Sequence, residues 1–244
     1  QKSCDYYLRL AEQQENKTRA YLALAKTYFE MQDYTSSIYY IEALLDNKDA
    51  LSKYELSELY GDIALCHAAL KHIGVGQASI RRSLELNEND PDTLIVAGRF
   101  FLMEAKACND ETAKAENQAK GELYFRQALN LIMEDERLDY LFTIGAACFD
   151  TQNFKLAAQY YEQINREFPD NAPATYFFLA YCYFYLEEAI SCMHYIAKMK
   201  HELPDAYSNL GTSDSILSDT RFNELMRNLK DSVNNGKVDL DNFL

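Results

Sequence analysis

Hydrophobic and polar positions along residues 138–171 predict two consecutive α-helices. The first half has one apolar face at helical spacing, formed by Leu141, Ile144, Gly145 and Cys148. A polar run at residues 151–153 interrupts this pattern. The second half then carries its own apolar face, formed by Ala157, Tyr161 and Ile164. Pro169 ends the second helix, because proline lacks an amide hydrogen and clashes with the preceding turn.

Small side chains in this stretch indicate that the two helices pack closely. Gly145 in the first helix and Ala157 in the second let the two backbones approach each other. The larger Leu141 and Tyr161 fill the space around that contact. The stretch therefore predicts a helical hairpin.

The same pattern recurs along the chain and predicts four further hairpins. Their leading large residues are Tyr21, Tyr60, Leu94 and Tyr176, in addition to Leu141. This spacing resembles the tetratricopeptide repeat, whose signature runs large, leucine, small and aromatic in the first helix and alanine, aromatic and proline in the second. Cys148 departs from that signature, since an aromatic residue is usual at its position. Two of the four spacings between hairpins are close to the ~34 residues typical of the family.

The resemblance implies an all-α fold, a right-handed superhelical solenoid of about five tetratricopeptide-like helix-turn-helix repeats with capping helices at both ends. We expect an N-terminal capping helix in residues 1–17, five repeats in 18–204, a C-terminal capping region in 205–233 and a flexible acidic tail in 234–244. An insertion around residues 104–120 is expected to lengthen both helices of the third repeat, with the turn near Asn109. The C-terminal capping helix follows from an amphipathic stripe formed by Phe222, Leu225, Met226, Leu229 and Val233.

Composition and charge narrow the classes of partner. The 244-residue chain carries 24 basic and 38 acidic residues, which gives a formal net charge of −14. Binding to nucleic acid or to an anionic membrane relies on clustered Lys and Arg, so we expect neither partner. No apolar run is long enough to span a bilayer, so we expect no membrane insertion.

Candidate catalytic and metal-binding residues are few. The six cysteines include no C-x2-C pair, which argues against a zinc site, and we interpret them as buried thiols that pack as small hydrophobes. His67 stands where the second repeat would carry a packing aromatic residue, and His194 and His201 have no plausible third ligand. Phosphate-binding loops, nucleophile elbows and zinc-protease motifs are absent from the sequence. We therefore predict no catalytic residues, no metal and no cofactor.

The resemblance also implies where a partner binds, because in this family the first helices line a concave groove for extended peptides or partner helices. The residues that we predict to line such a groove are Leu22, Lys26, Phe29, Leu65, Ile95, Arg99, Leu102, Phe142, Phe149, Phe177, Tyr181 and Phe184. Lys26 and Arg99 are the only cations in this set, which argues against the carboxylate clamp of chaperone-binding family members. The groove is instead apolar and aromatic, most strongly in the fourth and fifth repeats.

Three uses of this groove are open: partner binding, coverage by the C-terminal segment of the same chain, and self-association. A large exposed apolar patch usually marks a binding site, so we predict a non-catalytic interaction scaffold or adaptor that holds a protein or peptide segment. A structural homo-oligomer whose grooves or caps bury one another is the alternative, and an assembly or secretion-type chaperone is the third hypothesis. The compartment is undetermined: we expect a soluble protein that is cytoplasmic, or periplasmic or secreted if Gln1 is a processed N terminus.

Overall fold

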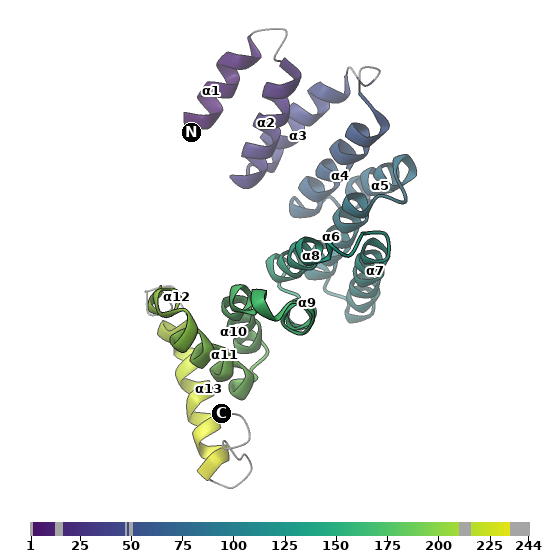
Figure 1. The fold of residues 1–244 in the computed structure, drawn as a ribbon. Helices are drawn as coiled ribbons and strands as arrows, with labels where there is room; N and C mark the ends of the chain where they lie inside the picture. The colour runs from purple at the N-terminus through teal and green to yellow at the C-terminus, as the bar shows by residue number, and fades with distance from the viewer. Residues whose placement is uncertain (1, 13–16, 47, 49–50, 210–215, 235–244) are drawn as a thin grey trace. The chain divides into compact units, whose positions relative to one another are not determined.

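Every regular element in the described part of the molecule is a helix (Figure 1). The computed structural model describes residues 2–12, 17–46, 48, 51–209 and 216–234. Successive helices pack against each other as pairs joined by short turns. The predicted all-α fold of tetratricopeptide-like helix pairs is therefore confirmed.

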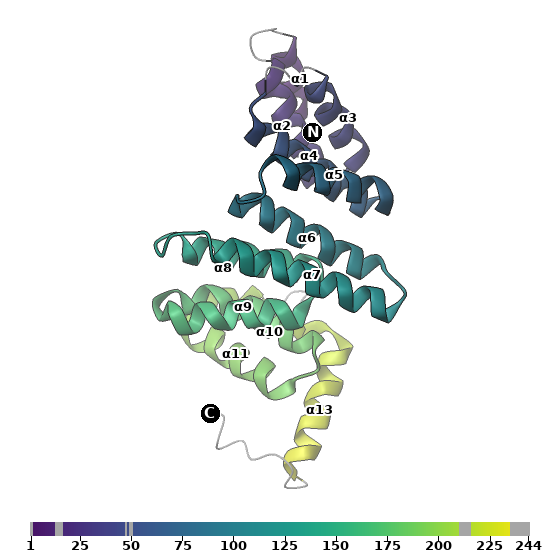
Figure 2. The same cartoon turned by 90° about the vertical axis from the view of Figure 1, so that its right-hand side faces the viewer.

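The chain forms two compact units, Gln1–Ile132 and Met133–Leu244, so that the division falls after the third predicted hairpin. The described helices of the first unit are α1 (Lys2–Ala11), α2 (Lys17–Glu30), α3 (Tyr34–Leu45), α4 (Lys53–Ala69), α5 (Ile73–Leu86), α6 (Pro91–Ala107) and α7 (Glu111–Leu129). Helix α1 packs on α2, and the pairs are α2 with α3, α4 with α5, and α6 with α7 (Figure 2). The link between α6 and α7 runs through residues 108–110, where the sequence places the turn of the lengthened repeat.

The second unit contains two further pairs and a C-terminal segment. Its described elements are α8 (Arg137–Asp150), α9 (Phe154–Glu167), the 3₁₀ helix η3 (Pro169–Thr175), α10 (Tyr176–Tyr185), α11 (Ala189–Glu202), α12 (Pro204–Asn209), the 3₁₀ helix η4 (Ile216–Ser218) and α13 (Thr220–Asn234). Helix α8 pairs with α9, and α10 pairs with α11. Helix α10 also packs on α9, so the two pairs share one core.

The turns inside four of the pairs have the same backbone geometry. A residue with a left-handed backbone ends the first helix of each, with φ between 60° and 62°, and these residues are Gln32, Lys71, Gln152 and Glu187. In the first pair the N–H of Gln32 donates to the carbonyl of Phe29, and the N–H of Asp33 donates to that of Tyr28, both at 2.9 Å. The equivalent two hydrogen bonds recur in the other three turns. They satisfy carbonyls that a helix end leaves without partners and fix the point at which the chain turns back.

Glycines allow helices within a pair to approach each other closely. A Cβ atom added to Gly121 in α7 would lie 2.9 Å from the carbonyl oxygen of Gly98 in α6. In the α8–α9 pair the ring of Tyr161 fills the space beside Gly145, 2.8 Å from the position of an added Cβ. Tyr161 and Ala157 are both buried, in agreement with the inner face predicted for the second helix of this hairpin.

Small hydroxyl side chains allow the helices to approach each other closely in the first two pairs. The buried Ser57 Oγ in α4 lies 3.1 Å from Ser83 Oγ in α5 and 3.1 Å from Thr93 Oγ1 in α6. Ser83 Oγ also donates to the carbonyl of Ser57 at 2.7 Å. In the preceding pair Ser37 Oγ donates to the carbonyl of Ala25 at 2.9 Å. Each buried hydroxyl therefore has a partner, which removes the cost of burying it.

The C-terminal segment packs on the last pair. Helix α13 contacts α11 and η4. Phe222 of the predicted amphipathic stripe is buried, and Leu225 and Met226 are half-buried. The side chains of Leu229 and Val233 lie outside the described residues, as does the predicted acidic tail after Asn234.

We expect Gly121→Ala to lower the free energy of unfolding by about 1–3 kcal/mol, because the added methyl group meets a backbone carbonyl that cannot rotate away. Gly74→Ala is the matched control, since an added Cβ there meets nothing within 4 Å. Urea denaturation followed by circular dichroism measures both variants. Equal effects of the two substitutions would show that the α6–α7 approach is not close.

Thiol reactivity tests the packing of the cysteines. Five of the six are buried and Cys108 is half-buried. Burial raises the pKa of Cys66 to about 11 and the pKa of Cys182 and Cys192 to about 12. We expect a disulfide reagent at pH 8 to label Cys108 first in the native protein and all six residues after denaturation. A fast phase of thiol labelling that persists in the native Cys108→Ser variant would contradict this expectation.

Candidate functional site

Four of the predicted groove residues line a hollow in the first unit. Leu22, Lys26 and Phe29 come from α2, and Arg99 comes from α6. The hollow encloses about 790 Å³ and also borders α3 and α4. Leu22 is 41% exposed, which leaves apolar surface in the lining. The hollow thus combines apolar and charged side chains.

Acidic side chains of α4 face the same hollow. Glu58 and Asp62 lie one turn apart on this helix, and both line the hollow together with Lys26 and Arg99. The guanidinium of Arg99 lies 5.8 Å from the centre of the Phe29 ring, within the range of a cation–π contact. Asp62 is not among the residues predicted from the sequence, because the walls around it come from other helices.

The carboxyl group of Asp62 titrates unusually close to neutral pH. Its pKa is raised to about 6, first because the surrounding walls remove water from around it and second because Glu58 repels its charge. Arg99 and Lys26 attract that charge and offset part of the increase in the pKa. Asp62 is nevertheless an exposed residue, because the hollow is open. The positive charge of a group that enters the hollow therefore stabilises the ionised form of Asp62.

Four other predicted groove residues are buried in this structure, and they are Leu65, Ile95, Leu102 and Phe184. Leu65 packs in the core formed with Ile80 and Phe100. Leu102 lies 3.0 Å from the position of a Cβ added to Gly121, inside the α6–α7 contact. Leu65, Ile95 and Leu102 pack inside the first unit and offer no exposed surface to a partner. Phe184 is buried for a different reason, because Phe222 of the C-terminal segment packs near its ring.

A continuous row of aromatic rings runs between α8, α9 and α10 in the second unit. We name it the aromatic ladder, and its members are Phe149, Phe154, Phe177, Phe178, Tyr181, Phe184 and Tyr185. The ring centres of Phe149 and Phe178 lie 5.4 Å apart. Those of Phe154 and Tyr185 are stacked at 4.4 Å. Neighbouring rings are thus within the distance at which aromatic pairs attract each other.

The ladder brings together predicted and unpredicted residues. Phe177 and Tyr181 were predicted, and their ring centres lie 4.6 Å apart. Tyr185 continues the same stripe of α10 at a spacing of one helical turn, a signal that was available in the sequence. Phe154 was not predictable in the same way, because its contact depends on how the turn aligns α8 with α9. Phe142 lies outside the ladder, with its ring centre 6.4 Å from that of Tyr161.

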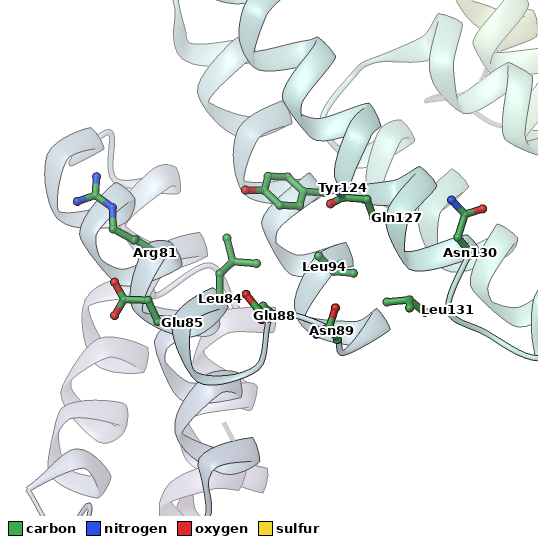
Figure 3. A pocket seen from close by; sticks show the side chains of 10 residues that line it. All are labelled: Arg81, Leu84, Glu85, Glu88, Asn89, Leu94, Tyr124, Gln127, Asn130 and Leu131. Carbon is green, nitrogen blue, oxygen red and sulfur yellow. The ribbon is translucent and has the colours of Figure 1, made fainter.

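A second hollow of the first unit has a different lining. It encloses about 610 Å³ among α5, α6 and α7 (Figure 3). Leu84, Leu94 and Tyr124 supply its apolar surface, and Arg81 and Glu85 lie at its α5 side. None of these residues was predicted as a site, and the lining combines leucine, phenol and charged groups.

The described residues contain no group of three or more His, Cys, Asp or Glu that is arranged to hold a metal ion. His67 and His72 approach each other, with their Nδ1 atoms 3.4 Å apart. Burial and the neighbouring His72 lower the pKa of His67.

None of the described helices has both the length and the hydrophobicity that a membrane span requires.

Comparisons with known proteins agree with this architecture. Residues 18–50, which include most of α2 and all of α3, match the sequence model of the tetratricopeptide repeat family. The crystal structure of PilW, described as a widely conserved type IV pilus biogenesis factor, is similar with a TM-score of 0.55 and 18% identity. The similarity covers 88% of this chain and 93% of the PilW chain. No curated protein sequence matches the chain significantly.

These findings define the class of the protein as a helical-repeat protein with tetratricopeptide-like pairs, and the predicted resemblance is confirmed. At 18% identity the likeness to PilW concerns the fold alone. Folds of this class typically serve as non-catalytic scaffolds for protein interaction, which supports the same general role for this chain.

The electrostatics of the first hollow can be tested directly. We expect the Asp62 carboxyl carbon to titrate by NMR with a pKa of about 6. Lys26→Met should raise this pKa further, because the substitution removes a charge that stabilises the carboxylate. Lys53→Met is the control, since Lys53 is exposed and lies outside the hollow lining. A pKa near the ordinary value of 3.8 would show that the hollow is fully hydrated.

Proposed function

We propose that this protein is a non-catalytic interaction scaffold that binds a segment of a protein partner on the aromatic ladder. The accessible part of the ladder carries this proposal, since Phe177 is 37% exposed and Tyr185 is 42% exposed. Both rings lie on the same stripe of α10, with Tyr181 between them, and an exposed apolar patch favours a binding site. Aromatic side chains also supply a large share of the energetically dominant contacts in protein interfaces.

The rings of the ladder are already held in place before a partner arrives. Phe177 contacts Tyr181 and Phe178, and Tyr185 is stacked on Phe154. Binding therefore costs little side-chain entropy at these positions. Each Å² of apolar surface that a partner removes from water contributes about 25 cal/mol. An apolar partner segment is the occupant that gains most from this surface.

The hollow of the first unit supplies an additional contact surface in this proposal. Leu22 and Phe29 offer apolar surface, and Lys26 and Arg99 are the groove cations expected from the sequence. The neighbouring carboxylates and the net charge of −14 favour partner segments that carry basic residues. This preference acts on the rate of association and on specificity more than on affinity.

Capture from an extract of the source cell tests the ladder. We expect Phe177→Glu to weaken retention of a bound protein at least about tenfold, because it places a charge within an apolar contact. Met133→Glu is the matched control, since Met133 is 66% exposed and outside the ladder. Captured proteins are identified by mass spectrometry, after circular dichroism has shown that both variants are folded.

Two outcomes would change this conclusion. Equal capture by the wild type and the Phe177→Glu variant would show that the ladder is not the binding surface. A molar mass by light scattering that corresponds to a dimer in the wild type and a monomer in the Phe177→Glu variant would assign the ladder to self-association, the alternative expected from the sequence.

A further inference from the structure

One end of the aromatic ladder is covered by a segment of the same chain. Residues 216–222 run from η4 into the first turn of α13, and Ile216 is 1% exposed and Phe222 9% exposed. The centre of the Phe222 ring lies 6.4 Å from that of Phe184. The backbone of Ile216 also lowers the pKa of the Tyr181 hydroxyl, which offsets part of the rise that burial causes. The segment thus occupies the Phe184 end of the ladder with apolar side chains.

The same segment places a guanidinium group on the rings. The central carbon of the Arg221 guanidinium lies 5.2 Å from the centre of the Phe184 ring and 5.3 Å from that of Tyr185. Both distances are within the range of a cation–π attraction. Asp219 holds the guanidinium in an ion pair at 2.6 Å and also accepts from the backbone N–H of Arg221 at 2.9 Å. The arginine is therefore oriented by its own segment while it contacts the ladder.

The rest of the ladder offers the same chemistry without this cover. Tyr185 keeps 42% of its surface exposed although Arg221 contacts it, and Phe177 at the other end is 37% exposed. The exposed residues Glu187 and Glu188 lie two and three positions after Tyr185 in the chain. Aromatic faces and carboxylates both attract a guanidinium, so the surface around Tyr185 is complementary to an arginine with an apolar neighbour.

We propose that residues 216–222 are an intramolecular occupant of the partner-binding ladder, and that the partner is a protein segment presenting an arginine beside an aromatic or aliphatic residue. This inference rests on the proposed function, since it names the partner chemistry of the same surface. The partner segment competes with Arg221 and Phe222 for Phe184 and Tyr185. The C-terminal segment consequently sets the concentration at which a partner binds.

The physical basis of the competition is the tether. A segment attached to its own binding surface acts at an effective concentration of roughly millimolar, so it excludes a weak ligand without needing high intrinsic affinity. The Arg221 side chain is exposed, so its removal does not disturb the core. Loss of its contact should therefore open the end of the ladder while the fold is retained.

A labelled synthetic peptide copying residues 216–230 of this chain tests the proposal by fluorescence anisotropy. We expect it to bind the full-length Arg221→Ala variant at least about tenfold more tightly than the wild type, in which the tethered segment competes. A peptide in which alanine replaces both Arg221 and Phe222 is the matched control and should lose this binding. Arg82→Ala, which removes an exposed arginine of the first unit, is the control for the receptor and should bind the peptide as the wild type does.

Three results would overturn the inference. The first is that the peptide does not bind the Arg221→Ala variant. The second is that the control peptide binds this variant as tightly as the original peptide does. The third is that adding Tyr185→Ala to this variant leaves the affinity for the peptide unchanged. A full-length Phe222→Ala variant, measured in the same way, must show the same gain if the segment acts as one occupant. If these tests fail while Phe177→Glu still abolishes partner capture, the proposed function stands and the segment is only a structural cap.

Discussion

The close approach of the two helices within each pair is the constraint on which the rest of the structure depends. A small residue on one helix admits a ring or a backbone from the other, as Gly145 admits Tyr161 and Gly121 admits the carbonyl of Gly98. Interiors are packed as densely as organic crystals, so an added methyl group at such a contact has no free volume to enter. The separation of the helices in turn decides which side chains lie inside a pair and which face outward.

The turns decide which side chains of neighbouring helices meet at the surface. Four pairs end their first helix at a residue with a left-handed backbone, and none of these residues is glycine. The strain at Glu187 is balanced by two backbone hydrogen bonds and by the packing that follows. Because the turn at Gln152 brings the start of α9 against the end of α8, Phe154 meets Phe149 with 5.7 Å between ring centres. The ladder therefore depends on backbone geometry as well as on aromatic composition.

The helix pairs and their inner faces were predictable because they follow from local periodicity. Tyr161, Ala157 and Ile164 are buried where the sequence placed them. The candidate groove was predictable only in part, since neighbouring positions on a helix point about 100° apart and a small rotation changes which side is buried. Leu65 and Ile95 are buried for this reason.

Contacts between distant segments were outside the reach of local patterns. Phe184 looks like a groove residue in the sequence, yet Phe222 covers it from a segment far along the chain. The division into two compact units was likewise not visible, because the repeat pattern continues across residues 132 and 133. Asp62 was missed because its raised pKa depends on walls supplied by other helices. Tertiary packing, which periodicity does not encode, decides each of these points.

In the proposed function the two candidate surfaces select partners by different physics. In the first unit, carboxylates around Asp62 act through charge, an effect that salt screens over about 10 Å at 0.1 M ionic strength. In the second unit, the ladder acts through apolar contact and cation–π attraction, which require contact and are less sensitive to salt when water is excluded. A basic segment suits the first surface and an apolar segment suits the second. The arginine and phenylalanine that the chain itself places on Phe184 combine the two properties within two consecutive residues.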